Sequence, residues 1–214
     1  MNVREALYAR HSTRKFLSTP VEKEKLTAVL EAASRTPSWA NTQPWEVFVA
    51  TGNTLDRIRA GYQNKYAEKV PVAPETPRPT KWSDAAQKRQ QLLHPGIVRD
   101  CGEAAKQFGA LNQAMFHAPA VIYIAMDRVL SEWSLYDIGA YAQSIMLAAV
   151  EQGLATIPAI TLMFYPDVLR RELKIPDHLK LTIGIAIGYA DNEHGVNKFI
   201  SERSPLEEVV HFFD

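Results

Sequence analysis

Apolar residues recur at helical spacing along several parts of the chain. Leu26, Val29, Leu30 and Ala33 form one such stripe, and spacings of three and four residues place them on one helix face. The preceding sequence Thr19-Pro20-Val21-Glu22 has a capping residue followed by proline at the first helical position. This pattern predicts a helix that begins at Pro20 and ends by Pro37. Further helices are predicted over 3–9, with Asn2 as N-cap, about 54–61 and 166–173.

Three short runs of apolar and β-branched residues predict strands. They cover Glu46–Ala50, Ala120–Ala125 and Leu181–Ala190. Helices outnumber strands, and their order does not produce regular βαβ units. The predicted fold is therefore α+β, with a small sheet covered by helices.

Two segments carry more apolar side chains than one small domain easily buries. The predicted helix 135–152 is apolar on nearly every side, and a helix without a polar face has to be buried. The segment 191–214 has little periodicity and ends in Val209-Val210-His211-Phe212-Phe213. An apolar tail of this kind needs a surface to lie on. Burial of the helix on all sides is easier if a second copy of the chain covers one of them.

Composition narrows the class of protein. The 214 residues fit a single domain, 1–214, and the formal net charge of +0 argues against a nucleic-acid partner. The single Cys101 excludes an internal disulfide and a cysteine-built metal centre, and the six histidines lack ligand spacing, so no metal is expected. The sequence shows no secretory signal or membrane-spanning stretch. A cytoplasmic protein without a membrane partner is expected.

The proline-rich segment 62–82 is a candidate lid. Its four prolines exclude a central helix or strand, and its aromatic and charged side chains could cover a site. A surface excursion without a role is the alternative. The following residues, 84–117, are predicted to be mainly helical, with interruptions at Pro95-Gly96 and at Gly102.

The clearest candidate chemistry lies at Arg10-His11-Ser12-Thr13-Arg14. In an extended segment, Arg10, Ser12 and Arg14 point the same way. Two guanidinium groups and a hydroxyl on one face suit a phosphate. A solvated basic turn is the alternative.

Three further segments carry weaker signals. The loop Pro37–Trp45 offers Ser38, Asn41 and Gln43 to the rim of a heteroaromatic ring, or it is a rigid buried crossing. Thr156–Thr161 offers backbone N–H groups, or it is a plain strand with a proline bulge. Arg203 could add a charge for an anion, although a lone arginine in a tail is usually solvated.

The motifs together resemble the FMN-dependent nitroreductase family over the whole chain. Each motif is weak alone, but four in order are specific: Arg10-His11-Ser12-x-Arg14, Pro37-Ser38-x-x-Asn41-x-Gln43-Pro44-Trp45, Glu151-x-Gly153-Leu154-x-Thr156 and Arg203-x-Pro205-Leu206. Within the family, the chain looks most similar to bacterial nitrobenzoate and nitrobenzene reductases. Some relatives have an acidic residue followed by glycine where this chain has Ile160-Thr161. The resemblance therefore does not predict the electronic properties of the flavin or the preferred substrate.

The resemblance implies a homodimer with two FMN sites at the interface and a C-terminal tail, 191–214, that wraps the partner subunit. Arg10, His11, Ser12 and Arg14 would bind FMN, the arginines holding its phosphate together with Arg203 and Ser201. The loop with Pro37, Ser38, Trp39 and Asn41 would reach the flavin from the other subunit. The segment that begins at Pro158 would present the backbone N–H groups of Ile160 and Thr161 near flavin N5.

The implied activity is ping-pong transfer of a hydride from NAD(P)H through FMN to a small nitroaromatic or quinone-like substrate. No side chain is expected to be catalytic, because the flavin carries the chemistry. An enone, quinone or flavin reductase and a reductive dehalogenase on the same scaffold are alternatives. A flavin-binding regulatory protein is the alternative outside enzymes.

Overall fold

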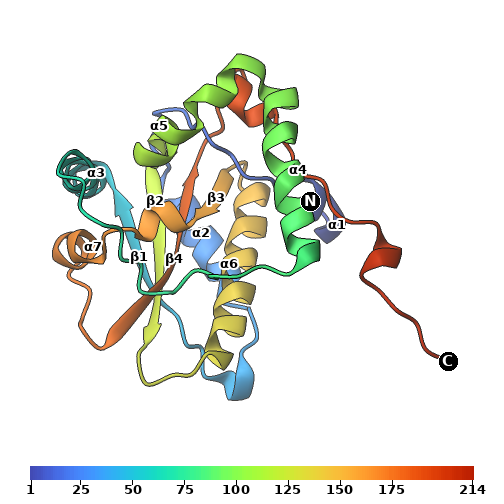
Figure 1. Cartoon of the computed structure of the whole chain (residues 1–214). Helices are drawn as coiled ribbons and strands as arrows, with labels where there is room; N and C mark the ends of the chain where they lie inside the picture. The colour runs from blue at the N-terminus through green and yellow to red at the C-terminus, as the bar shows by residue number, and fades with distance from the viewer.

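The computed structural model describes all 214 residues, with a four-stranded antiparallel sheet between two layers of helices (Figure 1). The strand order is β1-β2-β4-β3. The strands are β1 Glu46–Thr51, β2 Ala120–Asp127, β3 Ala155–Ala159 and β4 Leu179–Gly188. The α+β prediction is confirmed, and β3 is a strand that the apolar runs alone did not single out.

The central strand β2 is buried on both faces. Its Ile122 and Ile124 pack against α2 (Lys23–Ala33) and α6 (Trp133–Glu151). Its Val121 and Tyr123 belong to the core on the opposite face. That face is covered by α3 (Gly52–Ala67), α5 (Phe108–Gln113) and α7 (Pro166–Leu173). Burial on both faces explains why the β2 sequence is apolar without alternation.

The start of α2 differs from the prediction. The helix begins at Lys23, and its N-cap Glu22 has an extended backbone and makes no capping hydrogen bond. The Glu22 carboxylate instead accepts a hydrogen bond of 2.6 Å from the Tyr189 hydroxyl. The capping box predicted at Thr19 is therefore wrong, because its acidic member is engaged with another part of the fold. The first helix, α1 (Val3–Ala9), does have the predicted cap at Asn2.

Two helices are longer than predicted. Helix α3 continues to Ala67, so the first residues of the candidate lid are helical and Tyr62 is fully buried. Helix α4 (Asp84–Cys101) runs through Pro95, where an interruption was expected. Proline removes one backbone donor, but α4 packs against the 3-10 turn η5 (Gly195–Lys198), which supports the helix at this end. The predicted interruption at Gly102, whose φ is +53°, is confirmed.

The C-terminal segment contacts α4 as far as Ser204, and the end of the chain then extends away from the other elements (Figure 1). Beyond η5 the chain has only one short 3-10 turn, η6 (Leu206–Glu208). Phe212 and Phe213 are 87% and 92% exposed. The wrapping of a partner by this tail stays a prediction. No helix has the length and apolar character needed to cross a membrane.

Candidate functional site

The Arg10–Arg14 segment lies beside β3. Ser12 forms a parallel bridge with Thr156, and the Thr13 N–H donates to the Thr156 carbonyl at 3.0 Å. Because a strand advances ~3.3 Å per residue, Ser12 also lies within about 10 Å of Pro158. Two segments predicted from distant parts of the sequence are thus brought together.

The C-terminal segment returns to the same place. Burial, and after it the positive charge of Arg203, lowers the pKa of Arg10. The Arg203 guanidinium donates to the Ser201 carbonyl and hydroxyl at 2.9 and 2.8 Å. Neither arginine forms an ion pair with a carboxylate. Two neighbouring cations without a counter-ion suit an anionic ligand, for which an arginine provides paired donors.

Arg14 is placed differently from Arg10. Its guanidinium lies 5.1 and 5.4 Å from the ring centres of Phe108 and Phe199 and donates to the Ser12 carbonyl at 3.0 Å. This burial lowers the pKa of Arg14. Arg10, His11 and Thr13 line a cavity of about 400 Å³ that Ser12 and Arg14 do not line. The Arg14 side chain therefore lies against α5 and the residue that follows η5. The phosphate-binding face shared by Arg10, Ser12 and Arg14 stays a prediction.

The side chain of His11 is fixed locally. Its Nδ1 donates to the Ala9 carbonyl at 2.9 Å, which leaves Nε2 as the ring nitrogen available to a ligand. His11 therefore adds a polar group beside Arg10 at the wall of the cavity.

The loop with Pro37, Ser38 and Asn41 lies at the other end of α6. The Trp39 N–H donates to the Asp137 carboxylate at 3.2 Å, whereas Val150 and Gly153 line the cavity beside Arg10. At ~1.5 Å per residue, Asp137 and Val150 lie about 20 Å apart along the α6 axis. Figure 1 shows the two ends of α6 far apart. Within one chain, this loop and Arg10 therefore do not form one site.

The same loop is exposed and has an unusual backbone. Trp39 is 67% exposed, so the alternative of a buried crossing does not hold for this part of the loop. Ala40, Asn41 and Gln43 have φ values of 49°, 57° and 46°, and non-glycine residues adopt this region only when their surroundings impose it. The Gln43 N–H donates to the Ser38 hydroxyl at 2.9 Å and so helps to hold this conformation.

The chain leaves the sheet within the Pro158–Thr161 segment, after Ala159. Strand β3 ends at Ala159, and the 3-10 turn η4 (Ile160–Met163) begins at once. The alternative of a strand is therefore correct for Thr156–Ala159 and wrong for Ile160 and Thr161. The first N–H groups of such a turn have no acceptor within it, which keeps those of Ile160 and Thr161 available. The Tyr62 hydroxyl donates to the Leu162 carbonyl at 2.6 Å and holds η4 against α3.

Close packing against β4 also fixes η4. A Cβ atom added at Gly184 would lie 2.7 Å from the Leu162 Cβ, a separation that no side chain tolerates without displacement of η4. Glycine at this position therefore sets how closely the turn approaches the sheet.

Two residues that position the site were not identified from the sequence. Asp137 is 3% exposed and binds the Trp39 N–H, and Tyr62 holds η4 from the interior of α3. A buried carboxylate within an otherwise apolar helix was the visible signal for Asp137, because buried charges require partners. No sequence pattern marks Tyr62.

Comparisons with known proteins point to one family. The model of the nitroreductase family matches residues 7–189. The chain is 32% identical to the nitroreductase NfnB of Mycolicibacterium smegmatis, over 95% of this chain and 89% of that protein. It is 26% identical to a 4-nitrobenzoate reductase of Pseudomonas putida, over 95% and 92%.

A solved structure shows the same fold. The crystal structure of the FMN-dependent nitroreductase NfnB from Mycobacterium smegmatis in complex with NADPH superposes with a TM-score of 0.89 at 29% identity, over 100% of both chains. The resemblance inferred from the motifs is confirmed, and the chain belongs to the nitroreductase family.

Proposed function

We propose that the protein is an FMN-dependent NAD(P)H oxidoreductase that reduces small nitroaromatic compounds. The observation that carries this proposal is the pair of arginines without a carboxylate partner, Arg10 and Arg203, beside the start of β3, where Arg10 lines a cavity with Thr156. These two cations fit the phosphate of FMN, and the N–H groups of η4 fit the polar edge of its ring system. When bound, the flavin supplies the two-electron chemistry that links NAD(P)H to the nitro group.

The relatives support the same cofactor and substrate class. The NfnB structure is described as FMN-dependent and contains NADPH, and the Pseudomonas relative is named for 4-nitrobenzoate. Both match this chain over nearly its whole length. We assign the FMN contacts to the following residues: Arg10, His11, Ser12, Arg14, Pro37, Ser38, Trp39, Asn41, Pro158, Ile160, Thr161, Ser201 and Arg203.

The separation along α6 supports a symmetric homodimer. In a two-fold pair, each surface patch meets its own counterpart, so the Pro37–Asn41 loop of one subunit can lie against the arginines of the other. Exposed apolar side chains are available for such an interface. Trp133 and Tyr136 on α6 are 62% and 75% exposed, and the tail presents Phe212 and Phe213.

The visible absorption spectrum tests the proposed activity. The purified protein is expected to show flavin bands that bleach anaerobically with NADH or NADPH and return when 4-nitrobenzoate is added. Bands that never bleach would indicate a flavin-binding protein without this activity. A protein that takes up no FMN on reconstitution would contradict the proposal altogether.

Mixing two defective variants tests the shared site. Arg10→Ala/Arg203→Ala would lack the phosphate contacts, and Ser38→Ala/Asn41→Ala would lack the loop contacts. When equal amounts are unfolded and refolded together, half of the dimers are expected to be mixed, and each mixed dimer has one intact site. FMN occupancy should therefore recover to about one quarter of the wild-type value. The same variants refolded separately are the control, and no recovery on mixing would contradict a site built from two subunits.

A further inference from the structure

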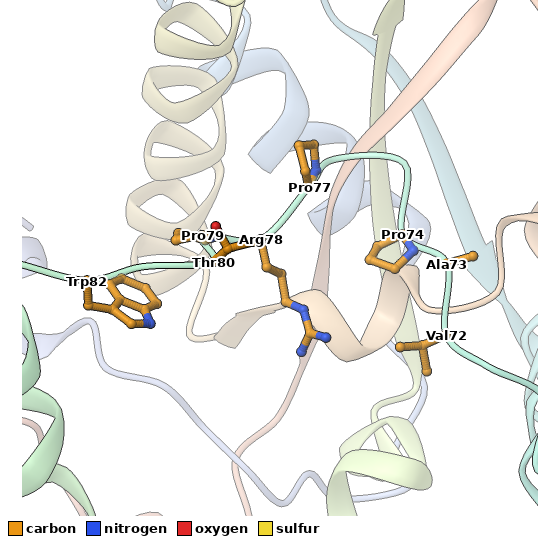
Figure 2. Close-up of a pocket in the computed structure, with 8 residues that line it drawn as sticks. All are labelled: Val72, Ala73, Pro74, Pro77, Arg78, Pro79, Thr80 and Trp82. Atoms are coloured by element: carbon orange, nitrogen blue, oxygen red, sulfur yellow. The ribbon is translucent and has the colours of Figure 1, made fainter.

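The segment from Val72 to Trp82 forms an open cleft of about 550 Å³ (Figure 2). This volume lies within the range of small-ligand pockets, about 300–1,000 Å³. Pro74, Pro77 and Pro79 form part of its wall, and each proline fixes its own φ angle. The cleft is therefore largely preformed, and Trp82 adds an aromatic surface to it.

The beginning of this segment is fixed to the body of the subunit. The Ala73 N–H donates to the Phe164 carbonyl at 3.0 Å, and the Thr76 hydroxyl donates to the Leu181 carbonyl at 3.1 Å. Between them, the Glu75 carboxylate accepts hydrogen bonds from Arg170 at 2.8 and 2.9 Å. Arg78 follows two residues after this anchor, so the position of its backbone is defined by the core.

The Arg78 guanidinium is a cation without a partner. It makes no ion pair or hydrogen bond with any protein group and lies 5.9 Å from the ring centre of Phe164. Figure 2 shows the side chain extending from the segment into the cleft. A cation over an aromatic face keeps the in-plane N–H groups of the guanidinium free. These donors match the two oxygens of a carboxylate.

The cleft adjoins the proposed flavin site. Phe164 directly follows η4, whose first residues, Ile160 and Thr161, are the proposed donors to the flavin ring. A flat aromatic compound held by a carboxylate at Arg78 would thus extend toward the reacting end of the site.

We propose that Arg78 determines substrate specificity by binding the carboxylate of an aromatic electron acceptor. This inference rests on the proposed function, and it narrows the substrate class to nitroaromatic acids. The same guanidinium could instead contact the additional phosphate that distinguishes NADPH from NADH. Measuring the two half-reactions one at a time distinguishes a carboxylate from a nucleotide phosphate. The nucleotide acts only in flavin reduction, and the acceptor acts only in flavin reoxidation.

The test compares Arg78→Gln with Lys81→Gln. Lys81 lies in the same segment and has the same charge, but it does not line the cleft. Arg78→Gln is expected to lower kcat/KM for 4-nitrobenzoate about 10- to 100-fold, because a hydrogen-bonded charge pair is lost. For neutral nitrobenzene the change should not exceed about threefold, and Lys81→Gln should change neither value more than that.

Benzoate provides a readout that does not depend on turnover. It carries the carboxylate but no nitro group, and its binding to the flavin-loaded protein can be followed by calorimetry. Arg78→Gln should weaken this binding about tenfold or more, with unchanged flavin content.

Three results would overturn the assignment of Arg78: equal losses for both acceptors, unchanged benzoate affinity, or slower flavin reduction by NADPH but not by NADH. The last result would assign the cation to the nucleotide phosphate. Failure of the proposed function would look different, because the wild-type protein would then bind no flavin or reduce neither acceptor.

Discussion

Replacing Arg10 and Arg203 together with alanine is expected to weaken FMN binding by about two to four orders of magnitude. Each hydrogen bond between a charged donor and a phosphate contributes roughly 1.5–3 kcal/mol, and a tenfold change in affinity corresponds to ~1.4 kcal/mol. Titration of the apoprotein with FMN, followed by flavin fluorescence, measures the dissociation constant. The loss should be accompanied by a smaller dependence of binding on salt, since fewer charges attract the phosphate.

The apoprotein of this double variant should be as stable as the wild-type apoprotein. The positive charge of Arg203 contributes to the lowered pKa of Arg10, so the two side chains repel each other when no anion lies between them. Arg4→Ala is the matched control, because Arg4 is an exposed arginine of α1 that forms no ion pair. An FMN affinity within threefold of the wild type would contradict the phosphate role, and an unstable apoprotein would indicate a structural one.

Glu75→Ala is expected to lower the free energy of unfolding by about 3 kcal/mol. The Glu75 carboxylate accepts hydrogen bonds from Arg170, from Arg128 and from the Leu181 N–H at 2.7 Å. The side chains of Glu75 and Arg170 are only 16% and 17% exposed. Removal of Glu75 leaves the largely buried Arg170 cation with backbone carbonyls and the Asp177 carboxylate, 3.9 Å away, as its remaining partners. Urea unfolding at pH 7 measures the loss. Glu68→Ala is the control, because Glu68 is exposed and unpaired, and an equal loss there would contradict this explanation.

The effect of Glu75→Ala should depend on pH. Burial acts to raise the pKa of Glu75, but the hydrogen bonds from Leu181, Arg170 and Arg128 outweigh it and lower the pKa. A carboxylate with a lowered pKa stabilises the folded state above its unfolded value, about 4.3, and this contribution is lost as the pH falls through the folded pKa. The stability difference between wild type and variant should therefore be full at pH 7 and shrink below about pH 4. A difference that stays constant through acidic pH would contradict the ionic role of Glu75.

The sequence predicted the layers of the fold better than the ends of its elements. The strands β1, β2 and β4 were visible as apolar runs, and α2 was visible as an apolar stripe at helical spacing, because each element carries the residues that it buries in its own sequence. The extension of α3 to Ala67 and the continuation of α4 through Pro95 were not. Both depend on contacts with elements distant in the sequence, and local propensity does not encode them.

The candidate site was likewise predicted in part: its segments were identified, but not the packing of every side chain. The motifs identified Arg10, Ser12, Pro158 and Arg203 as neighbours, and the structure brings these segments together. The packing of the Arg14 guanidinium against two aromatic rings, from α5 and the segment after η5, was not predicted, because contacts between distant segments set it. Arg78 carried no sequence signal, since a single arginine among prolines becomes a candidate only when the surrounding cleft is known.

The length of α6 has a thermodynamic consequence for the proposed dimer. If one flavin contacts arginines of one subunit and the loop of the other, binding of the cofactor and association of the subunits are linked equilibria. FMN then strengthens the dimer by the same factor by which dimerisation strengthens FMN binding. Dilution of the protein should release cofactor, and excess cofactor should shift the melting temperature to higher values in a way that depends on protein concentration.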